Sequence, residues 1–139
     1  MRVITEHIEI PTKGNSEIIN ISEKINSVVT KSGIGDGIVN IFVVGSTAGL
    51  STMEYEPGLL KDLPETFERI APMKHRYHHD YTWHDGNGYA HVRSTLLGTS
   101  LTIPIENGAT HLGVWQQVVL IDFDNRPRER KIICKILGV

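Results

Sequence analysis

Hydrophobic and polar positions along the N-terminal third of the chain predict two strands and a helix. The alternation over Arg2–Ile10 predicts a strand with one buried face. After a turn, Glu17–Asn20 is expected to return beside it as the second strand of a hairpin. Hydrophobic residues at helical spacing over Glu23–Lys31 predict a helix, which Ser22 is expected to cap and Gly33 to end.

The middle of the chain combines a buried strand with a second helix. Ile38–Val44 is a nearly continuous run of β-branched residues, which predicts a central strand covered on both faces. The small-residue loop Gly45–Gly49 separates it from a helical pattern that continues to Ile70. Pro64 lies inside this pattern and is expected to kink or split the helix, because proline lacks an amide hydrogen and clashes with the preceding turn.

The C-terminal third predicts a short helix at Ser94–Leu97 followed by an antiparallel meander. Its three strands are expected at Ser100–Ile105, His111–Phe123 and Glu129–Leu137, and Asn107-Gly108 is a strong hairpin signal between the first two. The whole pattern therefore predicts an α+β fold, a mostly antiparallel sheet with two or three helices.

Length and composition narrow the class of protein. A chain of 139 residues predicts one domain, residues 1–139. Its net charge of −2 offers no general attraction to nucleic acid. No hydrophobic stretch approaches the ~20 residues that span a bilayer, so no membrane segment is expected. The only cysteine, Cys134, is expected to be buried in a strand, and a chain with a single thiol suits a cytoplasmic protein.

The segment from His75 to Gly98 contains five of the seven histidines, together with acidic residues. Imidazoles and carboxylates are the ligands that zinc accepts. His79 and His91 are separated by a glycine-containing loop and are free to converge, with His84 as a third candidate ligand. The spacing matches no standard zinc motif, so a solvated polar loop explains the pattern equally well.

Three further positions are candidates for chemistry. Ser46 and Thr47 follow the buried strand, where hydroxyls and amides can hold an anion such as phosphate, although a plain connection has the same composition. Glu54 is either a metal ligand or general acid–base, or a carboxylate at a helix N-terminus. Gln116 is expected within a hydrophobic strand, where it lines a pocket or lies at an edge or interface.

Several motifs occur in order between Ile38 and Gly138 and together resemble the YjbQ-like family, known as secondary thiamine-phosphate synthase enzymes. The motifs are Ser46-Thr47-Ala48-Gly49-Leu50 with Glu54, Tyr77-x-His79, Asn87 with Ala90-His91-Val92-Arg93, the segment Leu96 to Pro104, Asn107-Gly108, and Leu112-Gly113-Val114-Trp115-Gln116. The resemblance implies a YjbQ-like α+β fold that assembles as a homotrimer.

The resemblance also implies a site and a reaction. A pyrimidine methyl diphosphate would lose pyrophosphate while the nitrogen of a thiazole phosphate attacks the methylene carbon, which requires positive charge and hydrogen-bond donors for the leaving group. The expected catalytic residues are Glu54, His79 and His91. A divalent ion, zinc or magnesium, is expected at His79, His91 and His84. Binding of the substrate or its phosphate is expected at Ser46, Thr47, Asn87, Arg93 and Gln116.

Two other functions are compatible with the same residues. One is a metal-dependent enzyme of another class, such as a hydrolase. The other is a non-catalytic trimeric module that binds a small phosphorylated metabolite. In either case a site between subunits is an alternative, with Glu54 and His91 contributed by different chains.

Overall fold

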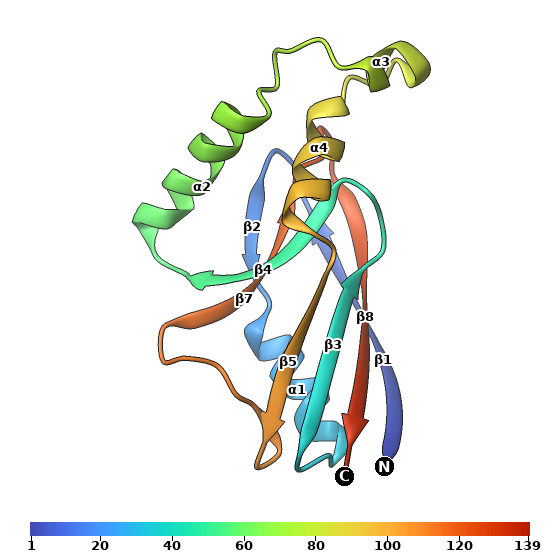
Figure 1. The fold of residues 1–139 in the computed structure, drawn as a ribbon, viewed down its shortest axis with the longest axis vertical. Coiled ribbons are helices and arrows are strands. Elements are labelled where there is room, and N and C mark those ends of the chain that lie inside the picture. Colours follow the sequence, from blue (N-terminus) through green and yellow to red (C-terminus); the bar gives the residue numbers. More distant parts are fainter.

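The computed structural model describes residues 1–139 as an α+β fold with two antiparallel sheets and four helices (Figure 1). The predicted fold class is confirmed, with one helix more than expected. The helices are α1 (Ser22–Ser32), α2 (Pro57–Ile70), α3 (His78–Trp83) and α4 (Gly88–Leu97). The strands are β1 (Arg2–Thr12), β2 (Glu17–Asn20), β3 (Gly37–Val43), β4 (Ala48–Glu54), β5 (Ser100–Glu106), β6 (Ala109–Thr110), β7 (Gln116–Asp122) and β8 (Arg128–Gly138).

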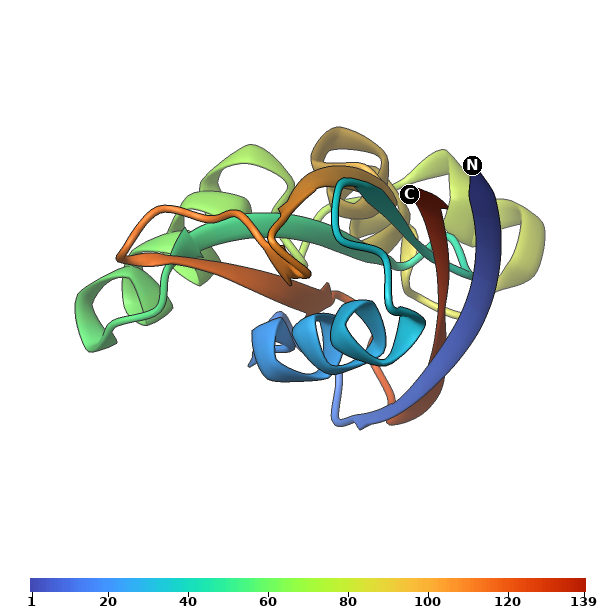
Figure 2. The same ribbon diagram turned by 90° about the horizontal axis from the view of Figure 1, so that it is seen from below.

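The two sheets share one hydrophobic core with α1. One sheet has the order β1-β8-β3-β5-β6 and the other the order β2-β7-β4. Figure 2 shows α1 lying against β7 and the curved β1–β8 pair. The core contains Ile25 and Val29 of α1 together with Ile41 of β3 and Leu120 of β7. A smaller cluster around Phe123 packs the other face of the three-stranded sheet against α2 and α4.

The predicted hairpin of the first two strands is wrong. β1 pairs with β8 along its whole length, while β2 pairs with β7 in the other sheet. The turn between them explains the separation, since Gly14, Asn15 and Ser16 all have left-handed backbone angles, with φ of 85°, 56° and 63°. Three successive residues of this kind redirect the chain, so β2 leaves the plane of β1.

The predicted C-terminal meander is also wrong, although the turn at Asn107-Gly108 is confirmed. Both turn residues have positive φ and join β5 to β6, as a type I′ hairpin requires. The expected long strand His111–Phe123 is interrupted, because residues 111–115 are not a strand and carry the chain to the second sheet. Its continuation, β7, then pairs with β2 and β4 rather than with β5 or β8.

Two helix details differ from the predictions. The N-cap of α1 is Ile21, and Ser22 does not cap the helix; the Ser22 hydroxyl instead accepts a hydrogen bond from the Val118 amide of β7 at 2.8 Å. Gly33 ends the helix in a left-handed conformation, as predicted. Helix α2 runs through Pro64 without a break. None of its residues is fully buried, so water can reach the carbonyl that the missing proline amide leaves unpaired.

The strand β3 is central, as predicted, but only one of its faces is covered. Val39, Ile41 and Val43 are fully buried, whereas Ile38 and Phe42 on the other face are 42% and 41% exposed. The loop expected at Gly45–Gly49 is shorter, because β4 begins at Ala48, so the connection joins two strands rather than a strand and a helix.

The single cysteine lies inside the core, as predicted. Cys134 is fully buried, and burial, reinforced by the charge of Glu6, raises the pKa of its thiol to about 11. No helix of this fold is both long and hydrophobic enough to cross a membrane.

Candidate functional site

Helices α3 and α4 bring His79 and His91 into contact at the upper end of the molecule (Figure 1). The centroids of the two rings are 4.1 Å apart. His79 Nε2 is buried without a hydrogen-bond partner and lies 3.4 Å from Asp85 Oδ1. A buried imidazole nitrogen beside a carboxylate and a second imidazole is a candidate ligand position.

The local sequence explains this convergence. The short helix α3 ends at His84, whose left-handed conformation (φ 57°) reverses the chain, and Gly86 continues the turn with φ of 69°. Asp80 on α3 then accepts a hydrogen bond from the Gly88 amide at 3.0 Å, which ties α3 to the first residue of α4. His78 and His79 lie on a helix rather than on extended backbone, and His79 is the more buried of the two.

The electrostatics keep the second histidine neutral. Burial lowers the pKa of His91, and the charge of His79 lowers it further, against the opposing effect of Asp85. A neutral imidazole has a free lone pair, as metal coordination requires. One ligand atom each from His79, Asp80 and Asp85 lie within 4.8 Å of one another; His91, although its ring contacts that of His79, is not part of this group.

A buried ionic network lies below the histidines, and the sequence did not reveal it. Arg130 donates from Nε and Nη2 to the two carboxylate oxygens of Asp122 at 2.7 and 2.9 Å, and Thr12 donates to the same carboxylate at 2.5 Å. Arg130 Nη2 also donates to the Thr47 hydroxyl at 2.7 Å, and that hydroxyl donates to Asp124 at 3.0 Å. All five side chains are buried.

The available signal was the spacing: Asp122 and Asp124 are two residues apart, as are Arg128 and Arg130 on the next strand. Residues two apart on a strand share a face, so Arg128 and Arg130 of β8 lie on one side, where they meet Asp122 at the end of β7 and Asp124 just beyond it.

Asp124 connects this network to the histidine site. Burial by itself would raise the pKa of Asp124, but hydrogen bonds from Asn87, the Asn125 amide, Thr47 and Arg128 outweigh burial and lower the pKa to about 2. Asn87 precedes α4 and its side-chain amide donates to Asp124 Oδ1 at 3.2 Å, while its own side-chain oxygen Oδ1 is buried without a partner. Unpaired buried oxygen and nitrogen atoms therefore occur on both sides of the α3–α4 turn, where a ligand or water would pair with them.

The other residues predicted for the site lie in different surroundings. Ser46 is exposed in the β3–β4 loop, next to the buried Thr47. Arg93 is buried and its guanidinium is already hydrogen-bonded, to the Ala71 carbonyl, the Ser16 hydroxyl and Glu68.

The remaining three predicted residues are not beside the histidine pair. His84 is not part of the cluster of His79, Asp80 and Asp85, and it lines a neighbouring hollow. Glu54 and Gln116 are partners in the β4–β7 register at the far end of these strands, away from α3 (Figure 1). Both are exposed, and Gln116 donates to the Thr52 hydroxyl rather than lying buried within a strand. Their functional roles stay predictions.

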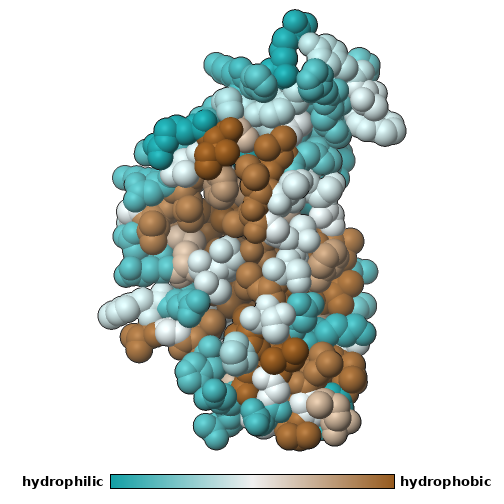
Figure 3. Space-filling model, viewed as in Figure 1, coloured by the Kyte–Doolittle hydropathy of each residue, from teal (hydrophilic) through white to brown (hydrophobic).

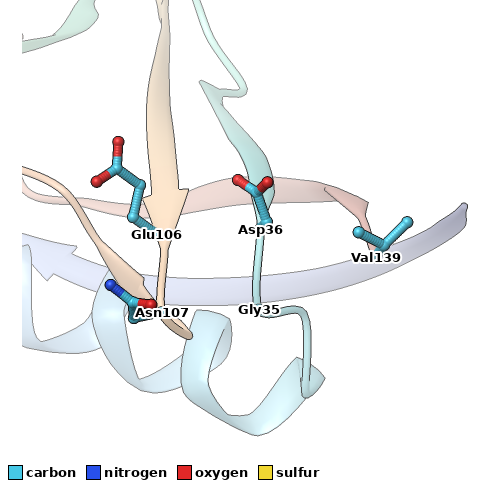
Figure 4. Close-up of a pocket in the computed structure, with 5 residues that line it drawn as sticks. All are labelled: Gly35, Asp36, Glu106, Asn107 and Val139. Carbon is cyan, nitrogen blue, oxygen red and sulfur yellow. The ribbon is translucent and has the colours of Figure 1, made fainter.

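A wider hollow of about 590 Å³ lies at the opposite end of the molecule (Figure 4). It is lined by Gly35, Asp36, Glu106, Asn107 and Val139. Its side chains are acidic or neutral and include no imidazole or cation, so the histidine segment remains the better candidate for chemistry.

The fold and the site define a small α+β protein with a histidine–carboxylate cluster where two short helices meet. The family described as UPF0047 protein YjbQ-like matches residues 6–139, and the chain belongs to this family, as its motifs indicated. A UPF0047 protein of Methanothermobacter thermautotrophicus is 35% identical over 138 residues, which cover 99% of this chain and 94% of that relative.

Solved structures agree with this assignment. A YbjQ-like protein of unknown function from Sulfolobus solfataricus has a TM-score of 0.90 at 30% identity and covers 99% of this chain and 100% of its own. A YjbQ/UPF0047 family protein from Clostridium acetobutylicum has a TM-score of 0.86 at 32% identity, with coverage of 95% and 99%.

Proposed function

We propose that the protein is a metal-dependent enzyme that acts on a phosphorylated metabolite at the α3–α4 turn. The observation that carries the proposal is the buried, unpaired Nε2 of His79, 3.4 Å from a carboxylate oxygen of Asp85 and beside the ring of His91. Leaving such a nitrogen without a partner costs free energy, and a divalent cation would remove that cost. The donors fit zinc well, since imidazoles are among its preferred ligands, and the carboxylates also accept magnesium.

The specific reaction that we propose is of the thiamine-phosphate synthase type. The bond from the methylene carbon to the diphosphate oxygen breaks, and pyrophosphate leaves with the electron pair. A bond from the thiazole nitrogen to the same carbon forms, so no proton needs to be transferred. A bound metal ion would supply positive charge to the leaving group. His79 and Asp85 would hold that ion, and the neutral His91 would donate or accept a hydrogen bond at the substrate.

Metal content tests the first part of the proposal. We expect untagged protein to bind about one equivalent of zinc per chain, as measured by elemental analysis after dialysis. His79→Ala should abolish this binding, whereas His78→Ala, which removes an exposed imidazole from the same helix, should not. Equal metal content in both variants, or none in the wild type after zinc is added, would exclude this site.

Turnover tests the second part. Wild-type protein with both substrates and Mg²⁺ should form thiamine phosphate and release pyrophosphate in equal amounts. The His91→Ala variant should form at least tenfold less, and His78→Ala should remain active. If the wild type makes no more product than His91→Ala, the synthase reaction is wrong even if the metal site is present.

We also infer a homotrimer in which Glu54 and Gln116 of one subunit approach the histidines of the next. Two exposed hydrophobic groups support the assembly: Ile38 and Phe42 on the open face of β3, and Val92 and Leu96 on α4. Figure 3 shows hydrophobic surface exposed on one face of the molecule. A closed ring would bury this surface.

Sedimentation at micromolar concentration should give three times the chain mass. Mixing inactive Glu54→Ala and His91→Ala chains after mild dissociation should restore part of the activity if the site is shared. A monomer in sedimentation would refute the assembly.

A further inference from the structure

A second hollow is formed by α3 and the residues directly before it, next to the histidine cluster. It has a volume of about 280 Å³ and is lined by His75, Arg76, Tyr77, Asp80, Tyr81 and His84. Asp80 belongs both to this hollow and to the cluster with His79 and Asp85. The two sites are therefore contiguous, and one substrate can occupy both.

Arg76 is the one fixed cation of this hollow and is not paired with any carboxylate. The buried or half-buried arginines Arg93, Arg128 and Arg130 each lie within 2.8 Å of a carboxylate oxygen. Arg76 forms no ion pair and no hydrogen bond to protein, and its guanidinium carbon lies 5.6 Å from the centre of the Tyr81 ring. The ring holds the guanidinium over α3 while leaving its N–H groups free.

Asp80 also lines the hollow, so its formal charge balances that of Arg76, but its carboxylate does not pair with the guanidinium. Asp80 already accepts the Gly88 amide through Oδ1 and faces the neighbouring His79 cluster. His75 and His84 add ring N–H groups, which an imidazole offers as donors even when it is neutral. The hollow is thus rich in donors and presents one fixed cation.

The groups that the sequence suggested for phosphate binding are already occupied within the chain. Arg93 donates to three protein oxygens, and the Thr47 hydroxyl lies between Arg130 and Asp124. Recruiting either group to an anion would break buried hydrogen bonds, which is costly. A phosphate therefore needs other donors, and Arg76 is the unpaired arginine beside the cluster.

We propose that this hollow binds the phosphate or diphosphate group of the substrate, with Arg76 as the principal anchor and His75 and His84 as additional donors. The inference rests on the proposed function, since it places the anionic end of the substrate next to the histidine cluster. The planar guanidinium can donate hydrogen bonds to two phosphate oxygens at once, which makes Arg76 a specificity residue for a phosphorylated substrate.

Calorimetric titration of metal-free protein with inorganic pyrophosphate tests the hollow without turnover. Wild-type protein should bind about one equivalent, and added salt should weaken the binding. Arg76→Ala should weaken it about tenfold, the scale expected for losing a charge-assisted hydrogen-bonding group. The pyrophosphate affinity of Arg76→Lys should fall between those of the wild type and Arg76→Ala, because lysine keeps the charge but cannot donate two parallel hydrogen bonds.

The matched control is Arg2→Ala, which removes another exposed arginine, near the N-terminus at the opposite end of the molecule (Figure 1). This variant should bind pyrophosphate like the wild type. If Arg76→Ala and Arg2→Ala bind equally well, or if the wild type binds no pyrophosphate, the proposal is overturned. Thermal melting of each variant checks that the fold is intact, as expected for exposed positions.

One further variant separates this inference from the proposed function. His79→Ala should lose zinc but retain pyrophosphate binding in metal-free buffer, because the anion is held by Arg76. If the wild type binds no zinc but still binds pyrophosphate in a way that depends on Arg76, only the metal site is rejected. Intact zinc binding with pyrophosphate affinity independent of Arg76 would reject the hollow alone.

Discussion

Replacing Asp124 by asparagine should destabilise the protein at neutral pH and flatten its response to acid. The carboxylate is fully buried and accepts hydrogen bonds from Asn87, Thr47 and Arg128. Asparagine preserves the shape but removes the charge, so Arg128 loses its carboxylate partner and Arg130 loses one of its two. Removing one partner of a buried ion pair costs about 3 kcal/mol.

The pKa supplies the magnitude of the acid response. A value of about 2 in the folded protein, compared with an ordinary value of 3.8, corresponds to roughly 2.5 kcal/mol at about 1.4 kcal/mol per pH unit. Because the folded pKa is the lower one, this stability is fully present above pH 3.8 and disappears as pH falls through 2. About half of it is lost by pH 3.

Urea unfolding at pH 6 and pH 3, at one fixed protein concentration, measures this effect. The difference in the free energy of unfolding between wild type and Asp124→Asn should narrow by roughly 1 kcal/mol at the lower pH. Other carboxylates titrate in both proteins and cancel in the difference. A gap that stays constant or widens between the two pH values would show that Asp124 is not held as a stabilised anion.

The remaining predictions concern the core, a strained turn and a close contact. Cys134 should not react with Ellman's reagent at pH 8 in the native protein but should give one thiol per chain in urea; rapid native labelling would contradict its burial and raised pKa. His84→Gly should stabilise the fold by about 0.5 kcal/mol in thermal melts, because relief of the strain at φ of 57° slightly exceeds the entropic cost of ordering a glycine. A lower stability of the variant would mean that the imidazole makes contacts that outweigh the strain. Gly49→Ala should destabilise by about 1–3 kcal/mol, since the new Cβ would lie 2.7 Å from both the Gly98 carbonyl oxygen and a Leu97 methyl carbon. Gly35→Ala is the control, because its new Cβ would lie at an ordinary van der Waals distance of 3.7 Å from the Val139 carbonyl oxygen. Equal effects of the two substitutions would be inconsistent with this packing.

Features that depend on a few neighbouring residues could be predicted from the sequence. The Asn107-Gly108 turn and the end of α1 at Gly33 follow from backbone preferences that act within a few residues. Alternation and hydrophobic runs located β1, β3 and β8 because a strand's pattern records which of its faces is buried. The ordered motifs indicated the family, which the comparison with known sequences confirms.

The candidate site could be predicted from the sequence only in part. The histidine segment was identified from its composition, yet the role of Asp80 and Asp85 beside His79 depends on α3 being helical and on the left-handed turn at His84. The separation of Glu54 from His91 depends on the direction in which β4 runs, which no local pattern records. Arg76 was not singled out, because an arginine among histidines differs from other surface cations only once its lack of a partner is visible.

The amino-acid sequence by itself determined where most strands and helices form and which segment carries the candidate chemistry. Only the tertiary structure decided that β1 pairs with β8, that β7 leaves the sheet of β5 and β6, and that two aspartates meet two arginines beneath the histidines. The physical reason is the range of the interactions. Backbone preferences and hydrophobic periodicity act over a few residues. Strand pairing and buried ion pairs join residues far apart in sequence, and many alternative pairings are compatible with the same local pattern.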